Sequence, residues 1–453
     1  MENIAEPRPP YDAHDAHAVE MNRLRRWLTG AERGAAVVGI CGPAGVGKTA
    51  MALRLAHEHA GARPVRFVHA RGRSVAALAD ECALRARMSA GGEASSAVLL
   101  LDDVTDGVPV ADLATPGRLI VATSREPLRM PSVDLRVWPA ANAQRLLSEI
   151  SGVNVHDSAL PRLCELAYHL PGAIELVAVH LADARTLLPS DVAKQLAEEH
   201  TRLLRRVLTV DEMLGLHTVL TFVYRRMSVA QQRVLRQLSV IEAPFDAAMA
   251  AAVSTDADVM LADLRRRRLV IEDEAGGGER LPRAVRDYAR ARLSNSEAEA
   301  ACLRYAESVV QRARAIGRRF TAGDGDGALM DFDALRRHIE AAFALAQPEF
   351  HVLPGRAARL AADLTEALQD ILPLRMSAAM VRTWQRARAD ALRRVRDVRG
   401  EIAARERLAE LHVAAGDDAA AATCHDDVQR LQEEWAAERR VLDLLAGQTM
   451  TKP

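Results

Sequence analysis

Residues 36–49 read AVVGICGPAGVGKT, and this stretch decides the fold of the first part of the chain. The apolar run at 35–41 predicts a buried strand, and the unbroken segment from Thr49 to His57 predicts a helix. The residues between them match G-x-x-x-x-G-K-[ST], in which backbone N–H groups and a helix N-terminus surround a phosphate. Strand, loop and helix follow in the order that this motif requires, so a coincidental glycine-rich turn is the weaker interpretation.

Lys48 has the most specific expected role in this loop. It is one of only three lysines among the 60 lysines and arginines of the chain. A lysine supplies a compact ammonium, which suits the space between the β- and γ-phosphates of a nucleotide. The candidate nucleotide-binding residues of the loop are Gly42, Gly45, Val46, Gly47, Lys48, Thr49 and Ala50.

Two neighbouring acids follow the next strongly apolar run. Residues 97–101 read AVLLL and predict a strand that ends in Asp102 and Asp103. Such a strand would deliver both carboxylates to the carboxyl edge of a parallel sheet, beside the loop. We expect Thr49 and Asp102 to hold Mg²⁺, and Asp103 to orient or deprotonate the attacking water. The alternative is a structural strand that meets an Asp-rich turn.

A further strand is predicted at 118–122, and it is followed by Thr123, Ser124 and Arg125. Its polar end would lie at the same edge of the sheet, where Arg125 can sense or neutralise a γ-phosphate. An ordinary surface arginine is the alternative, since the chain is rich in arginine.

Composition limits the class of protein. A length of 453 residues suggests two to four domains, and a net charge of −1 provides no global basic field for nucleic acid or an anionic membrane. The five cysteines show no C-x-x-C pairing, which predicts free thiols and no zinc site. We find no signal-peptide-like segment and no run of about 18 apolar residues. These features predict a cytoplasmic protein without membrane association.

The periodicity predicts an α/β P-loop domain followed by helices. Additional elements are predicted as a strand at 66–69, an amphipathic helix at 19–28, and helices at 75–87, 142–150, 160–170, 173–182 and 191–204. Three short helices at 230–238, 245–253 and 257–266 precede strands at 269–271 and 280–281 around a glycine-rich turn, 274–278, and a helix at 284–293. Three helices and a hairpin are typical of a winged helix. Beyond 296 the pattern is helical, except for a turn at 323–327 and a loop at 348–355.

This pattern divides the chain into five expected domains. They are an N-terminal lead helix at 1–34, a P-loop α/β nucleotide-binding domain at 35–140, an all-α helical lid at 141–214, a winged-helix domain at 215–295, and an α-helical, TPR-like sensor or interaction domain at 296–453.

Several of these motifs, in this order, resemble the signal-transduction ATPases with numerous domains, an NB-ARC-like class of P-loop ATPases, and in particular its bacterial members with helical-repeat C-termini. The loop at 42–49 and the segments LLDDV at 100–104 and ATSR at 122–125 are similar to its first three nucleotide motifs. Residues 169–176, HLPGAIEL, are similar to its Gly-Leu-Pro-Leu segment, whose proline packs on adenine. The resemblance therefore adds Pro171 to the candidate nucleotide-binding residues.

The chain departs from that class at two places. The class carries a Val-Gly-Arg-Glu segment that contacts adenine, whereas residues 15–18 here read DAHA. Its Met-His-Asp triplet, whose histidine touches the ADP β-phosphate, aligns with Leu281, Pro282 and Arg283.

The resemblance implies an ATP- and ADP-binding, slowly hydrolysing switch that requires Mg²⁺ and acts through a protein partner or by self-assembly of its C-terminal helical region. Two rivals stay open. One is a transcription regulator that binds DNA through the winged helix, which the acids Asp256, Asp258 and Asp263 of the expected recognition helix disfavour. The other is a scaffold that binds nucleotide without turnover.

Overall fold

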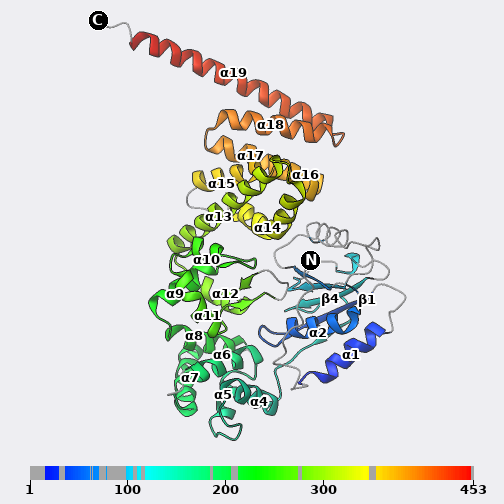
Figure 1. The fold of residues 1–453 in the computed structure, drawn as a ribbon, viewed down its shortest axis with the longest axis vertical. Helices are drawn as coiled ribbons and strands as arrows, with labels where there is room; N and C mark the ends of the chain where they lie inside the picture. Colours follow the sequence, from blue (N-terminus) through cyan, green and yellow to red (C-terminus); the bar gives the residue numbers. More distant parts are fainter. Residues whose placement is uncertain are drawn as a thin grey trace. The chain divides into compact units, whose positions relative to one another are not determined.

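The structure, a computed structural model, describes residues 16–29, 36–61, 63, 65–70, 78, 98–105, 110–113, 118–183, 187–205, 213–273, 278–345 and 354–449. The chain forms two compact units, which are described separately (Figure 1). Unit 1 contains the described residues up to Ser239 together with Pro244–Leu293, and unit 2 contains Val240–Ala243 and the described residues from Ser294 onwards. The five-domain division of the sequence stays a prediction.

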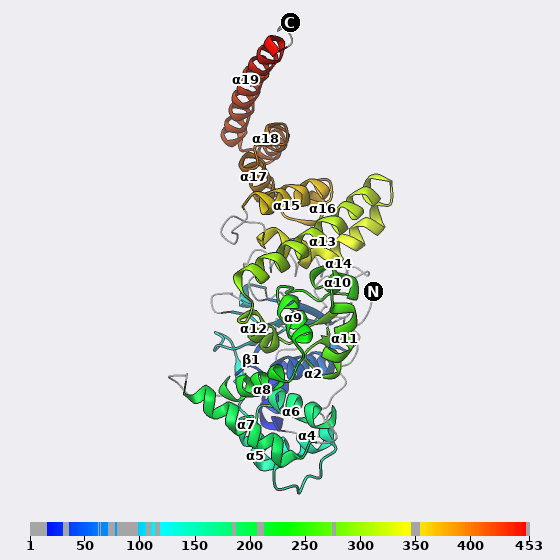
Figure 2. The ribbon, with the colours of Figure 1, turned by 90° about the vertical axis from the view of Figure 1, so that its left-hand side faces the viewer.

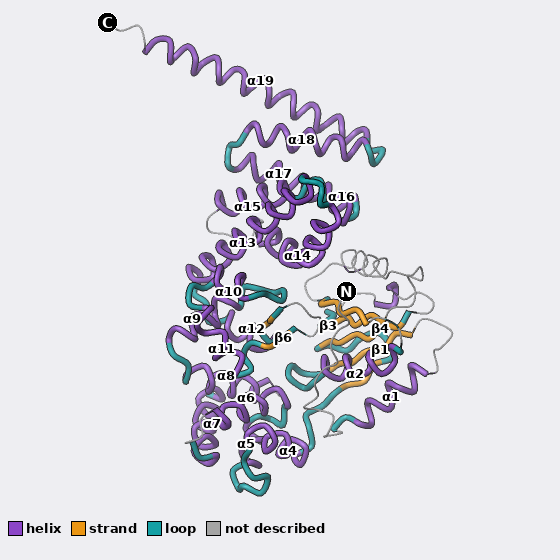
Figure 3. The backbone as a smooth tube through the Cα atoms, in the orientation of Figure 1, coloured by secondary structure: helices purple, strands orange, loops and turns teal. Residues whose placement is uncertain are grey.

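Unit 1 is built on a parallel sheet with the strand order β2-β3-β4-β1-β5 (Figure 3). The strands are β1 (Ala36–Cys41), β2 (Val65–His69), β3 (Val98–Asp102), β4 (Leu119–Ser124) and β5 (Ser132–Asp134). In register, Cys41 lies beside Ser124 and His69 beside Asp102, so the carboxyl ends of four strands meet at one edge. The expected parallel α/β fold is confirmed.

Helices pack on the sheet, and strand side chains also contribute to an apolar core cluster. This burial explains why the strands are continuously apolar. Helix α2 (Lys48–Ala60) packs against β3 and β4, and α1 (Ala18–Thr29) packs against α2, β1 and β5. Leu99, Leu101, Ile120 and Ala122 belong to a core cluster that also contains Leu78. Apart from Leu78, the helix predicted at 75–87 lies outside the described residues.

Five helices follow the sheet: α4 (Ala140–Ser151), α5 (Leu160–Leu166), α6 (Pro171–Asp183), α7 (Pro189–Leu204) and α8 (Met213–Arg225). The first four were predicted, whereas α8 was not. The prediction of one helix over 160–170 was too long. Helix α5 ends at Leu166 because Tyr168 and His169 adopt left-handed backbone angles, with φ of 54° and 51°, and a new helix begins at Pro171.

Residues 229–290, here called the helix–hairpin segment, contain three helices, a short antiparallel hairpin and a further helix. The elements are α9 (Val229–Leu238), α10 (Ala247–Val253), α11 (Ala257–Arg266), β6 (Ile271–Glu272), β7 (Glu279–Arg280) and α12 (Arg283–Arg290). Their order agrees with the predicted one, although both strands are shifted by one or two residues. The predicted turn lies outside the described residues except for Gly278. The winged-helix assignment itself stays a prediction.

Unit 2 is helical, and successive helices pack on one another (Figure 2). It contains α13 (Asn295–Thr321), α14 (Gly325–Leu345), α15 (Pro354–Ala367), α16 (Leu372–Arg375), α17 (Ala378–Arg394), α18 (Val398–Val413) and α19 (Asp418–Thr449). The predicted turn at 323–327 was too long, because α14 already begins at Gly325. The predicted loop at 348–355 lies outside the described residues except for its last two residues, with which α15 begins. None of the described helices is both long and apolar enough to cross a membrane.

Candidate functional site

The loop between β1 and α2 has the backbone geometry of an anion-binding loop. Gly42, Gly45 and Gly47 have φ of 140°, 80° and 102°, values that side chains rarely allow. A Cβ atom at Gly42 would also lie 2.5 Å from the carbonyl oxygen of Leu135. The glycines of the motif are therefore required by the local backbone, and the loop leads directly into the N-terminus of α2.

Backbone carbonyl groups of this loop hold the side chain of Lys48 in place. Its Nζ donates hydrogen bonds to the carbonyl oxygens of Gly42 and Pro43, both at 2.8 Å. The pKa of Lys48 is lowered to about 8, mainly because burial disfavours the ammonium and secondly because Arg125 lies nearby. Asp102 opposes this shift, and Arg283 adds to it. The loop thus presents a partly buried cation together with two nearby guanidinium groups.

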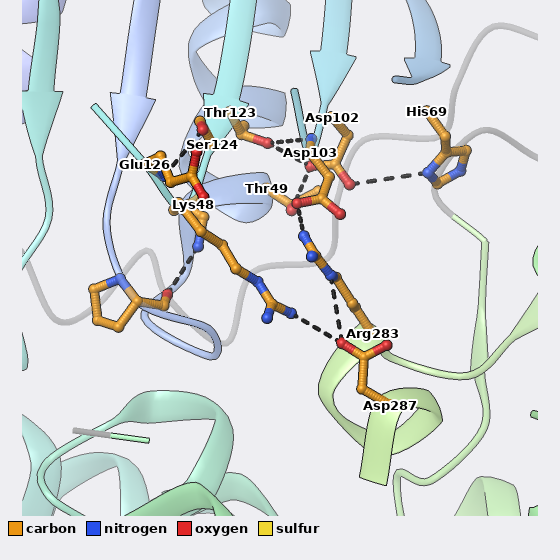
Figure 4. Close-up of polar contacts among 12 residues, drawn as sticks. Lys48, Thr49, His69, Asp102, Asp103, Thr123, Ser124, Glu126, Arg283 and Asp287 are labelled. Atoms are coloured by element: carbon orange, nitrogen blue, oxygen red, sulfur yellow. Dashed lines mark hydrogen bonds and ion pairs between the residues drawn. The ribbon is translucent and has the colours of Figure 1, made fainter. Parts of the chain in front are cut away.

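Asp102 connects the loop with the neighbouring strands (Figure 4). Its Oδ1 accepts hydrogen bonds from the hydroxyl of Thr49 at 2.7 Å and from that of Thr123 at 2.8 Å. Thr49 and Asp102 are 53 residues apart in the chain. The sheet therefore brings together the two residues that the sequence predicted as Mg²⁺ ligands.

Asp103 and Arg125 lie at the same edge, but both are paired with α12 of the helix–hairpin segment. The carboxylate of Asp103 forms an ion pair with Arg283. Arg283 Nε lies 3.6 Å from Asp287 Oδ2, and Arg125 Nη2 donates a hydrogen bond of 3.4 Å to the same oxygen. Figure 4 shows Arg283 between Asp103 and Asp287. The four side chains form a continuous ionic chain of alternating charge.

His69 makes a second connection between the sheet edge and the helix–hairpin segment. Its Nδ1 lies 3.9 Å from Asp102 Oδ2, and its Nε2 lies 3.4 Å from Asp273 Oδ1. Asp273 follows β6, and its side chain is fully buried. Arg280 of β7 also approaches Asp273, with Nε to Oδ1 at 3.1 Å. His69 therefore lies between the hairpin and Asp102, the acid that the sequence predicted as a metal ligand.

Pro171 lies at the first turn of α6, which touches the loop. The backbone N–H of Gly172 donates a 2.9 Å hydrogen bond to the carbonyl of Gly45. A Cβ atom at Gly172 would lie 3.1 Å from the Cα of Gly45, so this close approach leaves little room for a side chain. The segment with Pro171 is thus held directly against the candidate phosphate loop.

The lead segment also reaches the loop, although it lacks the adenine-contacting sequence of the class. His17 hydrogen-bonds the backbone of Val46, and its ring lies edge-on to Trp138 with 6.5 Å between centroids. Burial lowers the pKa of His17, although nearby Glu20 and the Val46 hydrogen bond act in the opposite direction. His17 therefore lies beside the loop, and Trp138 lies next to His17.

The four consecutive arginines 265–268 are largely engaged inside unit 1. Arg265 pairs with Glu279 of the hairpin. Arg266 lies 3.1 Å, and Arg267 3.8 Å, from the carboxylate of Asp183 at the end of α6. Arg265, Arg266 and Arg267 therefore already have acidic partners within unit 1.

Sequence reasoning identified most of the residues that the structure brings to the edge. It missed Thr123 as a partner of both acids, the His69–Asp273 contact and the pairing of Asp103 and Arg125 with α12. One signal was available: Arg283 aligns with the last position of the class's Met-His-Asp triplet and stands four residues before Asp287, a spacing that places both on one helix face.

The polar groups of the loop and of the sheet edge fit a phosphate together with a hard divalent cation. Backbone N–H groups, an ammonium and two guanidinium groups can bind an anion. Among the described residues, no group of three or more His, Cys, Asp and Glu could hold a metal by itself. The hydroxyl of Thr49 and the carboxylate of Asp102 instead match Mg²⁺, which usually takes one or two protein oxygens and completes its shell with phosphate and water.

Comparison with curated proteins finds regulatory relatives. The chain is 29% identical over 305 residues to the regulatory protein AfsR of Streptomyces griseus, and 29% identical over 307 residues to AfsR of Streptomyces coelicolor. Each alignment covers 58% of this chain and 30% of the relative. The chain therefore matches less than a third of the length of either protein. No family model matches the chain.

Comparison with solved structures finds matches of low similarity, of which two are described here. One is a signal-transduction ATPase with a tetratricopeptide repeat sensor from Pyrococcus horikoshii, with a TM-score of 0.47, 14% identity, and coverage of 96% of this chain and 79% of that protein. The other is the ORC2 protein of Aeropyrum pernix in ADPNP–ADP complexes, with a TM-score of 0.27, 14% identity, and coverage of 64% and 97%. The phosphate-loop and acidic motifs, and the parallel sheet that brings them to one edge, agree with the expected resemblance of this chain to the signal-transduction ATPases with numerous domains.

Proposed function

We propose that this chain is an ATP- and ADP-binding, slowly hydrolysing molecular switch with a regulatory role. The observation that carries the proposal is the hydrogen bond from Thr49 to Asp102, which joins the phosphate-binding motif to the acidic motif. A fortuitous glycine-rich turn would have no reason to meet the acidic end of a separate strand. ATP is preferred over GTP because of the resemblance to an ATPase class.

Each candidate residue has a distinct proposed role. Lys48 binds the β- and γ-phosphates, assisted by the backbone of the loop, and the candidates for this are Gly42, Gly45, Val46, Gly47 and Ala50. Thr49 and Asp102 hold Mg²⁺, which when bound neutralises charge on the phosphates. Asp103 orients or deprotonates the attacking water, and Arg125 stabilises charge on the γ-phosphate. Pro171 contacts the base.

The output of the switch is proposed to be a protein contact. The relatives are named regulatory proteins, and unit 2 is an array of packed helices, a form of surface on which proteins commonly bind other proteins. The partner is proposed to be either another protein or a second copy of this chain. A DNA-binding role for the helix–hairpin segment is less well supported, because Arg265, Arg266 and Arg267 already have acidic partners.

Calorimetric titration of the full chain with ATP, ADP and GTP, each with and without Mg²⁺, tests the proposal. We expect ATP and ADP to bind, Mg²⁺ to strengthen ATP binding, and GTP to bind more weakly. Phosphate release during single and multiple turnovers then separates a slow ATPase from a scaffold without turnover. A protein that binds none of these nucleotides would overturn the proposal.

Arg125→Ala is expected to reduce ATP affinity by roughly 10-fold while ADP affinity stays nearly unchanged. The reason is that a charge-assisted hydrogen bond to the γ-phosphate is worth about 1.5–3 kcal/mol, and ADP lacks that group. Titration of the variant with ADP and with a non-hydrolysable ATP analogue measures the difference. Arg129→Ala serves as the control, because Arg129 is an exposed arginine in the loop before β5. Equal losses for both nucleotides would assign Arg125 another role.

A further inference from the structure

Helix α17 and the turn that joins it to α18 carry a high density of positive charge. Residues 382–399 contain seven arginines and two aspartates, although the whole chain has a net charge of −1. Arg388 is buried, and its Nη2 lies 3.4 Å from Glu366 Oε1 of α15, so it belongs to the packing between these helices. The other six arginines are exposed or half-buried and are called the arginine stripe below: Arg382, Arg386, Arg393, Arg394, Arg396 and Arg399.

The arginine stripe runs along one face of α17 and continues past the end of that helix. Arg382, Arg386 and Arg393 are separated by four and seven residues, and both spacings keep side chains on one helix face. A rise of about 1.5 Å per residue places these residues about 6 Å and about 10 Å apart along the axis. The next three arginines lie at the end of α17, in the turn, and in the first turn of α18, which packs against α17. The positive charges therefore form a line.

The arginine stripe has no acidic partners within the described part of the chain. Other arginines of unit 2 do have such partners: Arg314 Nη2 lies 3.0 Å from Asp363 Oδ2, and Arg405 Nη1 lies 2.7 Å from Asp427 Oδ2. The chain has 61 acids for 60 lysines and arginines, so acids are not scarce. The unpaired charge is therefore a local property of this surface.

The two aspartates within 382–399 leave the arginine stripe positive. Asp397 Oδ2 accepts a 2.7 Å hydrogen bond from Arg359 Nη1 of α15. Asp390 is exposed on α17, and Arg394 Nε donates a 3.3 Å hydrogen bond to its backbone carbonyl rather than to its carboxylate. Guanidinium groups stay protonated, and like charges one helical turn apart repel each other. An external anion would relieve this repulsion.

The chemistry of this surface favours phosphates arranged in a row. Arginine forms paired hydrogen bonds with phosphate oxygens. A helix that lies on a membrane places large apolar side chains beside its basic ones, whereas the described exposed large apolar residues include none within 382–399. Unpaired bases are bound by stacking on aromatic rings. Trp384 already stacks on Phe343, with 3.9 Å between ring centroids, and Arg399 covers Trp435. A duplex, which carries its phosphates on the outside, therefore fits best.

We propose that the arginine stripe binds the phosphate backbone of a nucleic-acid duplex without reading its bases. The arginine stripe belongs to unit 2 and the candidate nucleotide loop to unit 1, so this site does not depend on the proposed function. Because the positive charge is confined to one surface, the net charge of the chain does not oppose binding at short range. Binding is expected to be strongest at low salt.

Fluorescence anisotropy of a labelled DNA duplex, titrated with the full chain in the absence of ATP and ADP, tests the proposal. Each neutralised phosphate contributes about −0.9 to the slope of log affinity against log salt concentration, so six arginines predict a slope of about −5. The slope is measured between about 50 and 200 mM salt with a duplex of about 20 base pairs. A duplex of scrambled sequence should bind equally well.

A triple variant with Arg382→Gln, Arg386→Gln and Arg393→Gln removes the three charges that share one face of α17. Its slope should be less steep by about 3, and its affinity at low salt should fall by roughly 10-fold or more. The corresponding Arg→Lys substitutions keep the charge and should keep the slope. Glutamine and lysine both favour helices, so thermal unfolding should be unchanged in either variant.

Arg318→Gln, Arg407→Gln and Arg430→Gln together form the matched control, because they remove the same charge from unit 2 outside 382–399. This control should bind the duplex as the wild type does. A second variant, Arg265→Gln with Arg266→Gln, tests the rival surface on the helix–hairpin segment and should also bind normally.

Three results would overturn the proposal. The first is a wild type without salt-dependent binding, and the second is an equal loss of affinity in the triple variant and the matched control. The third is a loss confined to the variant of Arg265 and Arg266. Vesicles rich in phosphatidylserine and poly-glutamate are added as competitors at equal concentrations of negative charge. If either displaces the labelled duplex as effectively as unlabelled duplex does, the partner is a membrane or an acidic protein and the proposal is wrong.

Discussion

Lys48→Ala is expected to abolish measurable nucleotide binding while unit 1 keeps its fold. The ammonium is the proposed point charge facing the β- and γ-phosphates, and charge-assisted hydrogen bonds are worth about 1.5–3 kcal/mol each. The loss of two such bonds corresponds to a decrease in affinity of roughly 100-fold or more. Titration calorimetry with ATP and ADP measures the loss, and circular dichroism reports the fold.

The structure explains why the fold should survive this substitution. Lys48 Nζ is bonded to the loop carbonyls of Gly42 and Pro43, and removal of the lysine leaves the buried residues of α2, such as Leu53 and Leu55, in place. Lys194→Ala is the matched control, because this second lysine is largely exposed and its Nζ lies 3.8 Å from Asp191, one turn away on the same helix. Unchanged ATP affinity in a folded Lys48→Ala protein would contradict the assignment of the loop.

Asp103→Asn is expected to lower ATP turnover by about 10²- to 10⁴-fold while ATP still binds. The amide cannot accept a proton from the attacking water, and positioned bases contribute rate factors of this size. Asp102→Asn should behave differently and weaken Mg²⁺-dependent binding, because its Oδ1 is the acceptor that meets the hydroxyl of Thr49. Phosphate release and titration with and without Mg²⁺ distinguish the two effects.

Asp134→Asn is a control of the same chemistry, because Asp134 also ends a strand at this edge of the sheet but its side chain is exposed. It should leave binding and turnover unchanged. Asp103→Asn also removes the acidic partner of Arg283, so its turnover should be compared with that of Asp287→Asn, which removes the other acid of the ionic chain and leaves the proposed base intact. Full turnover in both Asp102→Asn and Asp103→Asn would mean that these carboxylates are structural.

Several elements could not be predicted because their stability comes from partners distant in the sequence. Strand β5 has only three residues and one buried side chain, Val133, too few for a recognisable pattern. It exists because β1 supplies its hydrogen bonds: Gly39 N–H bonds Pro131 O, and Leu135 N–H bonds Cys41 O. Helix α8 packs against α6 and α7. The end of α5 was equally unpredictable, because two non-glycine residues with positive φ mark it.

The loop, the strands around it and the polar residues that end them could all be predicted from the sequence. These features depend on local rules: glycines where φ must be positive, apolar runs where a strand is buried, and acids where a strand reaches the edge of a sheet. The meeting of Thr49 with Asp102 could also be expected, because parallel strands and a known motif place both at one edge.

The charged partners of the acids and of the arginine at that edge could not be predicted, because they follow from the packing of distant segments. Arg125 and Asp287 are 162 residues apart in the chain. The chain contains many other arginines, and the local sequence does not distinguish Arg125 from them as the partner of an acid. The sequence does not show which opposite charges will pair, because the energy of an ion pair depends on the distance between the charges and on their burial. The fold supplies both when it packs α12 beside the ends of β3 and β4, and it thereby pairs two proposed catalytic residues, Asp103 and Arg125, with charged residues of α12.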